Sequence, residues 1–173
     1  MSRLTFCSVL ASSLLLVSQL LAQETKFDAT AVCNFDATKQ IAVEYERVSF
    51  DVKKRFWGKE VHYGKVWGPG GKPMTLFTNT PISIAGTNLA AGAYTLFVIP
   101  EEKRWILVVS KSSDTSGRYD EKLDAARVPM EFGELPSAEP EFSVYFGHVA
   151  SDQCSMRLDL EKTRAWVTIR ENK

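Results

Sequence analysis

The sequence predicts an all-β protein built as a single antiparallel β-sandwich, with barrel-like closure of the sheet as the alternative. Two observations carry this prediction. Apolar and polar residues alternate with a period of two in short runs along most of the chain, as in half-buried strands. Turn-forming residues separate about nine such runs, at the spacing expected of a sandwich or barrel. No window of helical period has a convincing length.

The first elements follow a polar segment at residues 23–40, which shows little periodicity. Alternation begins at residue 41 and continues to residue 50, with a change of phase at Glu46 and Arg47 that predicts a β-bulge. Residues 61–67 suggest the end of another strand. Residues 68–73 hold three glycines and two prolines and therefore predict a loop, after which residues 74–78 form a short strand.

A central hairpin is the clearest expected element. Residues 82–84 alternate and lead into a turn, and residues 94–99 and 105–109 then form two runs that are apolar on both faces. Such runs indicate strands in the middle of a sheet. Pro100, which fixes φ at the start of a tight turn, joins them.

We expect the β-sandwich domain to span residues 41–170. In its last part, a loop and a short helical segment come before the strands resume. Residues 110–118 form a polar loop, and residues 119–126 have room for one or two helical turns. Clean alternation then predicts three strands, at residues 142–146, 156–160 and 166–169.

Residues 1–22 have the layout of a secretory signal peptide. Arg3 precedes an apolar run at residues 4–21, and the small residue Ala22 stands before the polar Gln23, which predicts cleavage between the two. An uncleaved anchor is the alternative, but several polar residues dilute the run that a spanning helix would need. We therefore expect an exported protein, periplasmic or extracellular, with no membrane span after cleavage.

Two cysteines, Cys33 and Cys154, remain after that cleavage. An even number of cysteines in an oxidising compartment predicts one disulfide, which would tie the N-terminal segment to the C-terminal strands. Two independent buried thiols are the alternative.

Charge and motifs exclude several classes of function. The chain carries 21 basic and 21 acidic residues, so nothing in its balance points to nucleic acid. Its two histidines, His62 and His148, do not have the spacing of zinc ligands, and we predict no metal and no cofactor. Phosphate-loop, calcium-loop and serine-nucleophile patterns are missing as well.

Four residues form the candidate ligand site: Lys65, Trp67, Asp124 and Arg127. Asp124 and Arg127 are three apart beside an apolar strand, where a buried arginine would need an anionic partner. Trp67 ends a strand at the glycine-rich loop, where an indole can offer a flat face to a ligand. The alternative is a structural ion pair and a core tryptophan.

A family resemblance adds to this picture. It is carried by residues spread along the chain: Tyr63, Gly64, Lys65, Val66, Trp67, Gly86, residues 91–100, Trp105, residues 119–122, Asp124, Arg127 and Val128. In their order and spacing, over about residues 41–169, they resemble a bacterial exported family catalogued as domain of unknown function 2911. The resemblance implies an exported, mostly β protein with no established activity. The chain departs from the family pattern at residues 68–73 and at Ser116-Gly117.

Two functional hypotheses follow. The first is a non-catalytic binding or structural module of the cell envelope or extracellular space, with a small molecule, carbohydrate or envelope component as its partner. The second is a hydrolase that acts on an envelope or carbohydrate substrate through carboxylates or His148. Neither the catalytic residues nor the oligomeric state follows from the sequence.

Overall fold

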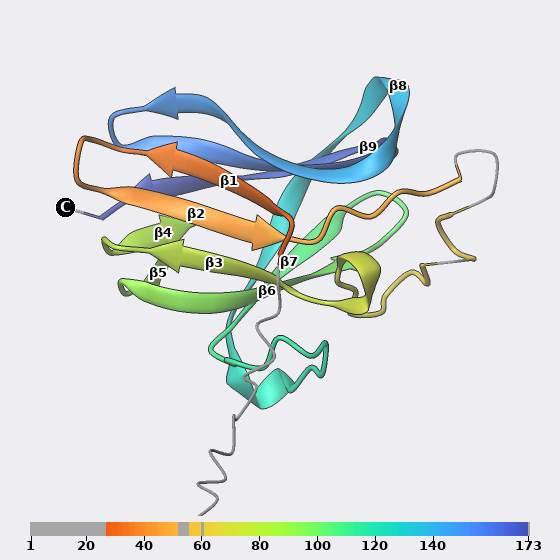
Figure 1. The fold of residues 1–173 in the computed structure, drawn as a ribbon, viewed down its shortest axis with the longest axis horizontal. Coiled ribbons are helices and arrows are strands. Elements are labelled where there is room, and N and C mark those ends of the chain that lie inside the picture. Colours follow the sequence, from red (N-terminus) through yellow and green to blue (C-terminus); the bar gives the residue numbers. More distant parts are fainter. Residues whose placement is uncertain (1–26, 52–55, 60, 173) are drawn as a thin grey trace, which may run out of the picture.

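The computed structural model describes residues 27–51, 56–59 and 61–172, so the predicted signal peptide and its cleavage site lie outside the described residues. The described chain forms one antiparallel sheet of nine strands, in the order β1-β2-β3-β6-β7-β8-β9-β4-β5 (Figure 1). The predicted all-β antiparallel class is therefore confirmed, and the sheet is not closed into a barrel.

The strands are short at the start of the chain and long at its end. Their bounds are β1 Ala29–Asn34, β2 Gln40–Tyr45, β3 Met74–Thr78, β4 Ile82–Ile84, β5 Thr87–Leu89, β6 Gly92–Pro100, β7 Trp105–Ser110, β8 Asp124–Ala150 and β9 Gln153–Glu171. Two 3₁₀ turns accompany them, at Pro69–Gly71 and Glu121–Leu123. In the described part of the chain, no helix has the length and apolar character needed to cross a membrane.

The central hairpin is confirmed as β6 and β7, which lie in the middle of the sheet. The N–H of Glu101 donates to the carbonyl of Arg104 at 2.9 Å and closes the turn. The strand β1 lies within the polar segment 23–40 and pairs with β2. The sheet thus extends one strand further toward the N-terminus than the alternation indicates.

Two expected strand continuations are wrong. β2 ends at Tyr45, and the chain then leaves the ladder instead of forming a bulge: the N–H of Phe50 donates to the carbonyl of Pro140 at 2.7 Å. Residues 61–67 contribute only isolated bridges, among them that of Trp67 to Val98. Gly64, with a φ of +71°, turns the chain there, so a continuous ladder cannot form.

The last three predicted strands merge into two long bent ones. Residues 142–146 belong to β8, whereas residues 156–160 and 166–169 are two arms of β9. β9 doubles back near Glu161, whose φ is +50°. The N–H of Glu171 consequently donates to the carbonyl of Asp152 at 2.9 Å, so the two ends of β9 meet (Figure 1).

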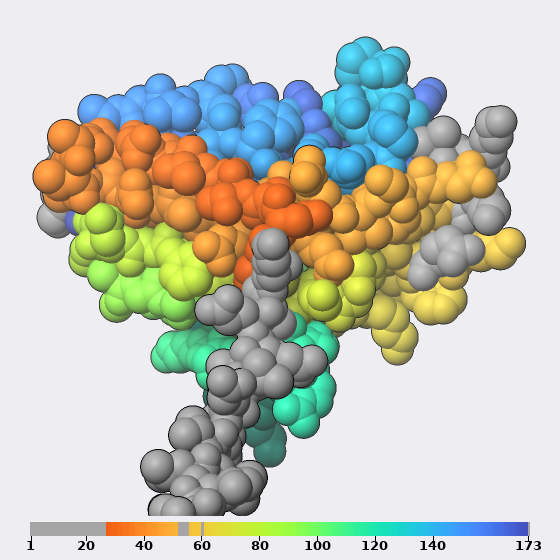
Figure 2. All heavy atoms as spheres, viewed as in Figure 1, coloured from red at the N-terminus to blue at the C-terminus, as the bar shows by residue number. Residues whose placement is uncertain are grey.

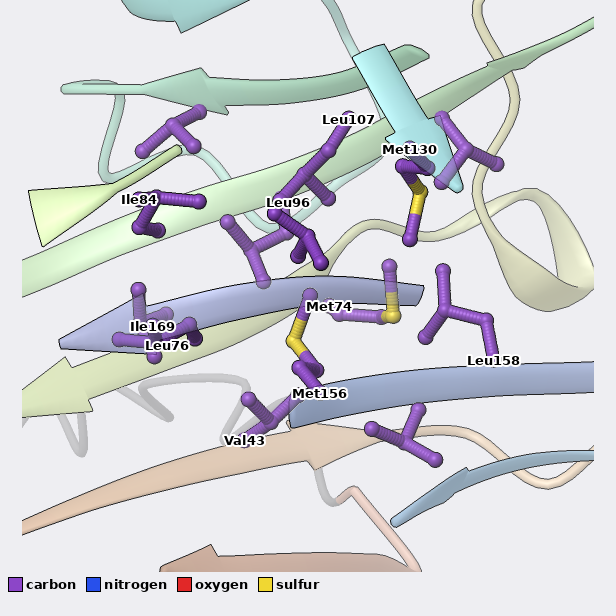
Figure 3. Packing of buried hydrophobic residues seen from close by; sticks show 14 of the residues in the cluster. Val43, Met74, Leu76, Ile84, Leu96, Leu107, Met130, Met156, Leu158 and Ile169 are labelled. Atoms are coloured by element: carbon purple, nitrogen blue, oxygen red, sulfur yellow. The ribbon is translucent and has the colours of Figure 1, made fainter. Parts of the chain in front are cut away.

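One main hydrophobic core lies between the two layers that this curved sheet makes. Leu76 of β3 and Leu96 of β6 belong to the same core cluster as Leu158 and Ile169 of β9 (Figure 3). β1 also contacts β8, although the two are not hydrogen-bonded neighbours, and the surface view shows these segments packed together (Figure 2). Alternate residues of β9 therefore face the core, and those between them face outward.

Candidate functional site

The outward face of β9 is hollowed into a cleft of about 640 Å³. Because β9 doubles back, outward residues from both of its arms line the hollow, together with residues of β8. Its charged and imidazole side chains are Glu131, His148, Arg157 and Arg164, and its neutral ones are Gln153, Ser155, Trp166 and Thr168. We call this hollow the Arg157 cleft.

A buried carboxylate holds one of the two arginines in place. Arg164 donates to Asp159 through Nε at 2.8 Å and through Nη2 at 2.6 Å, and the side chain of Asp159 is only 5 % exposed. The hydroxyl of Tyr145 donates to the same carboxylate at 3.0 Å. These bonds to Asp159 raise the pKa of Arg164. The charge of Arg164 is thus compensated, and its two-pronged geometry fixes its direction.

The second arginine, Arg157, is held without being neutralised. Its Cζ lies 5.7 Å from the centre of the Tyr145 ring, and Arg164 lies 5.3 Å from the same ring. Its Nη2 is 3.3 Å from the ring nitrogens of His148. No carboxylate among the described residues is paired with Arg157. The cleft therefore contains a half-buried guanidinium with an aromatic support and a free charge.

Two glycines of β8 give the cleft its shape. A Cβ on Gly147 would lie 2.6 Å from Cζ of Arg157, and one on Gly133 would lie 3.3 Å from the Trp166 ring. A glycine inside a strand weakens it and marks a close approach by another group. Here the approaching groups are the guanidinium and the indole, which can therefore lie flat against the backbone of β8.

The structure brings together two of the four residues predicted from the sequence. Arg127 donates from Nε to Asp124 at 2.7 Å, and Tyr119 donates its hydroxyl proton to the same Oδ2 at 2.6 Å. Nη2 of Arg127 also lies 2.9 Å from Glu121. Arg127 is 38 % exposed, so this cluster is a surface ion-pair network that fastens the 3₁₀ turn Glu121–Leu123 to β8.

The structure separates Trp67 from that pair. Trp67 packs edge-on against Phe56 and Phe142 on the core side of the sheet. Tyr119 instead packs on Phe97, whose side chain points to the opposite face. Lys65 is exposed. Trp67 also lines a smaller hollow of about 360 Å³, whose described lining is mainly aromatic and glycine.

Tyr119 provides a pH-dependent prediction. Burial, and then the bond to Asp124, raise the pKa of Tyr119 to about 12 from 10.0. The neutral phenol is thus favoured by folding, so its contribution to stability is complete below pH 10 and is lost as the pH rises to about 12. We expect the urea midpoint to fall more steeply between pH 10 and 12 in the wild type than in Tyr119→Phe. Equal slopes of the urea midpoint against pH in the two proteins would contradict this prediction.

Sequence reasoning did not single out Arg157, Arg164 and Trp166, although His148 was named for a possible hydrolase. A signal was present: Ser155, Arg157 and Asp159 alternate with core residues along one arm of β9. The alternation does not reveal the bend at Glu161, which brings the second arm of β9 next to the first. No group of three or more metal-ligating side chains occurs among the residues that the structure describes.

Comparison with known proteins gives one finding. Residues 28–169 match the family model described as "Protein of unknown function (DUF2911)", and every residue that lines the Arg157 cleft lies within this match. Neither the curated proteins nor the solved structures contained a match to the chain.

Proposed function

The chain belongs to the DUF2911 family of proteins of unknown function, and from that premise we propose that it is a non-catalytic binding module that holds a carbohydrate or envelope component in the Arg157 cleft. Export to the periplasm or the extracellular space is part of the proposal, and its support is the signal-peptide layout of residues 1–22.

The observation that carries the proposal is the mixed lining of the cleft. Its volume of about 640 Å³ falls in the range of small-molecule sites. Trp166 offers an apolar flat surface, and the hydroxyl or amide groups of Ser155, Thr168 and Gln153 stand around it. A sugar ring needs both kinds of group, because it presents C–H bonds on its faces and hydroxyl groups at its rim.

One observation favours hydrolysis as a second candidate. His148 and Glu131 line the same cleft, and an imidazole and a carboxylate are the groups that general acid–base catalysis uses. A hydrolase would turn over the saccharide that it binds, and His148→Ala would abolish turnover. Binding without turnover in the wild type would leave the non-catalytic module as the function.

Trp166→Ala tests the proposed binding. We expect about tenfold weaker affinity for the bound saccharide, since a truncated aromatic anchor in a binding site costs more than about 1 kcal/mol. The measurement is isothermal titration calorimetry with a panel of neutral and acidic envelope oligosaccharides. Phe77→Ala, at an exposed phenylalanine of β3, is the matched control and should bind as the wild type does. A panel without a single binder would overturn the proposal.

A further inference from the structure

We propose that the Arg157 cleft selects ligands by a carboxylate group, which Arg157 binds, so that its occupant is an acidic saccharide of the uronic-acid class. This inference rests on the proposed function and adds the chemistry by which the cleft discriminates. It is carried by the one guanidinium of the cleft whose charge no described carboxylate compensates.

The first step of the argument is charge. Arg164 and Asp159 neutralise each other through two hydrogen bonds and leave no charge for a ligand. The described partners of Arg157 are the imidazole of His148 and the ring and hydroxyl group of Tyr145, none of which is a carboxylate. A half-buried cation is stabilised when an anion takes the place of the water that it has lost, so an anionic ligand is favoured at this point.

The second step is the number of charges. The carboxylate of Glu131 also lines the cleft, and it comes from a part of β8 that is remote in sequence from His148. One uncompensated cation beside one acidic wall suits a monoanion better than a dianionic phosphate. The planar fork of a guanidinium also matches the two oxygens of a carboxylate. A uronic acid combines that monoanion with a sugar ring for Trp166.

The third step is preorganisation. The ring of Tyr145 lies within 6 Å of both guanidinium groups, and Gly147 leaves room for Arg157 against the backbone. Arg164 is fixed in turn by Asp159. The direction of Arg157 is thereby set before a ligand arrives, which reduces the entropy lost on binding.

The experiment compares each acid with its own methyl ester, because esterification removes the charge and keeps the sugar. Oligosaccharides of galacturonate, glucuronate and mannuronate, and their methyl esters, are titrated calorimetrically into the whole mature protein at neutral pH. We expect at least one acid to bind about tenfold more tightly than its ester, as a hydrogen bond to a charged group allows. Raising the salt concentration should lower the affinity for the acid and leave the affinity for the ester unchanged.

Variants assign the discrimination to its residue. Arg157→Gln should lower the affinity for the acid to that of the ester, with no change for the ester. Gly147→Ala should weaken the acid as well, because the new Cβ displaces the guanidinium while the strand remains. Arg118→Gln is the matched control: Arg118 is an exposed arginine paired with Asp114 outside the cleft, and its loss should change nothing. Circular dichroism checks that each variant is folded.

The outcomes separate the two proposals. Esters that bind as tightly as their acids overturn the carboxylate assignment and leave the binding module standing. Discrimination that persists in Arg157→Gln also overturns it. If inorganic phosphate binds more tightly than every uronate, the carboxylate assignment is wrong and the group that Arg157 binds is a phosphate. Absence of binding by all acids and all esters, together with the neutral panel above, overturns the proposed function itself.

Discussion

Oxidation of Cys33 and Cys154 to a disulfide is expected to raise the free energy of unfolding by about 4–5 kcal/mol in the chain-entropy model. The bond would close a loop of more than about 100 residues, and long loops lose the most entropy when their ends are tied in the unfolded chain. The reaction removes two protons and two electrons from the thiols, and oxidised glutathione in the refolding buffer takes up the electrons.

The structure supports this expectation by the position of the two thiols. Both are free, buried cysteines, on β1 and β9, which come from opposite ends of the described chain. Their side chains are hydrogen-bonded to each other. Burial raises the pKa of both thiols, so neither forms a reactive thiolate readily once the protein has folded. We therefore expect the bond to form during folding.

Urea unfolding with and without dithiothreitol measures the effect. The oxidised protein should unfold at a higher urea concentration than the reduced one. The double variant Cys33→Ala/Cys154→Ala, which cannot form the bond, should show the same midpoint in both buffers. Two thiols that can be alkylated after the oxidatively refolded protein is denatured without a reducing agent would rule the disulfide out.

Phe142→Ala is expected to destabilise the protein by about 3–5 kcal/mol. Phe142 is fully buried, and its ring packs edge-on against Tyr45 at 5.8 Å and Trp67 at 5.7 Å. It thus joins β8 to β2 and to the segment before the glycine-rich loop. Alanine would remove its buried surface and leave a cavity that these rings cannot close without moving.

Phe77→Ala is the control for this substitution. It removes the same atoms from a ring that is 41 % exposed on the outer face of β3. The loss should stay well below that of Phe142→Ala, because no sealed cavity forms. Chemical unfolding followed by circular dichroism gives both values. Equal losses in the two variants would show that position 142 does not belong to the core.

The central hairpin shows what local pattern alone can predict. The apolar runs of β6 and β7 and the proline turn between them depend on neighbours in sequence, so their pairing follows from alternation and turn chemistry. The contact between Asp124 and Arg127 has a different origin, because residues three apart on a regular strand face opposite sides; the irregularity of β8 opposite Val109 and Ser110 brings the two side chains together.

Other features depend on segments that are far apart. β1 is nearly invisible in the sequence because its core-facing residues, Ala31 and Cys33, are small, whereas Val32 between them faces outward, and only its pairing with β2 makes it a strand. Trp67 and Asp124 both border predicted strands. The side chains that contact them nevertheless lie on opposite faces of the sheet. A one-dimensional pattern does not specify which face a side chain occupies near an irregular segment such as residues 61–67.

The sequence by itself determined the all-β antiparallel class and the central hairpin, because both are encoded by short-range periodicity and turns. Only the tertiary structure decided the Arg157 cleft. Arg157 and Trp166 lie nine positions apart on one strand, and a straight strand would hold them about 30 Å apart. The bend of β9 at Glu161, and the two glycines of β8 that receive the side chains, bring them to one hollow.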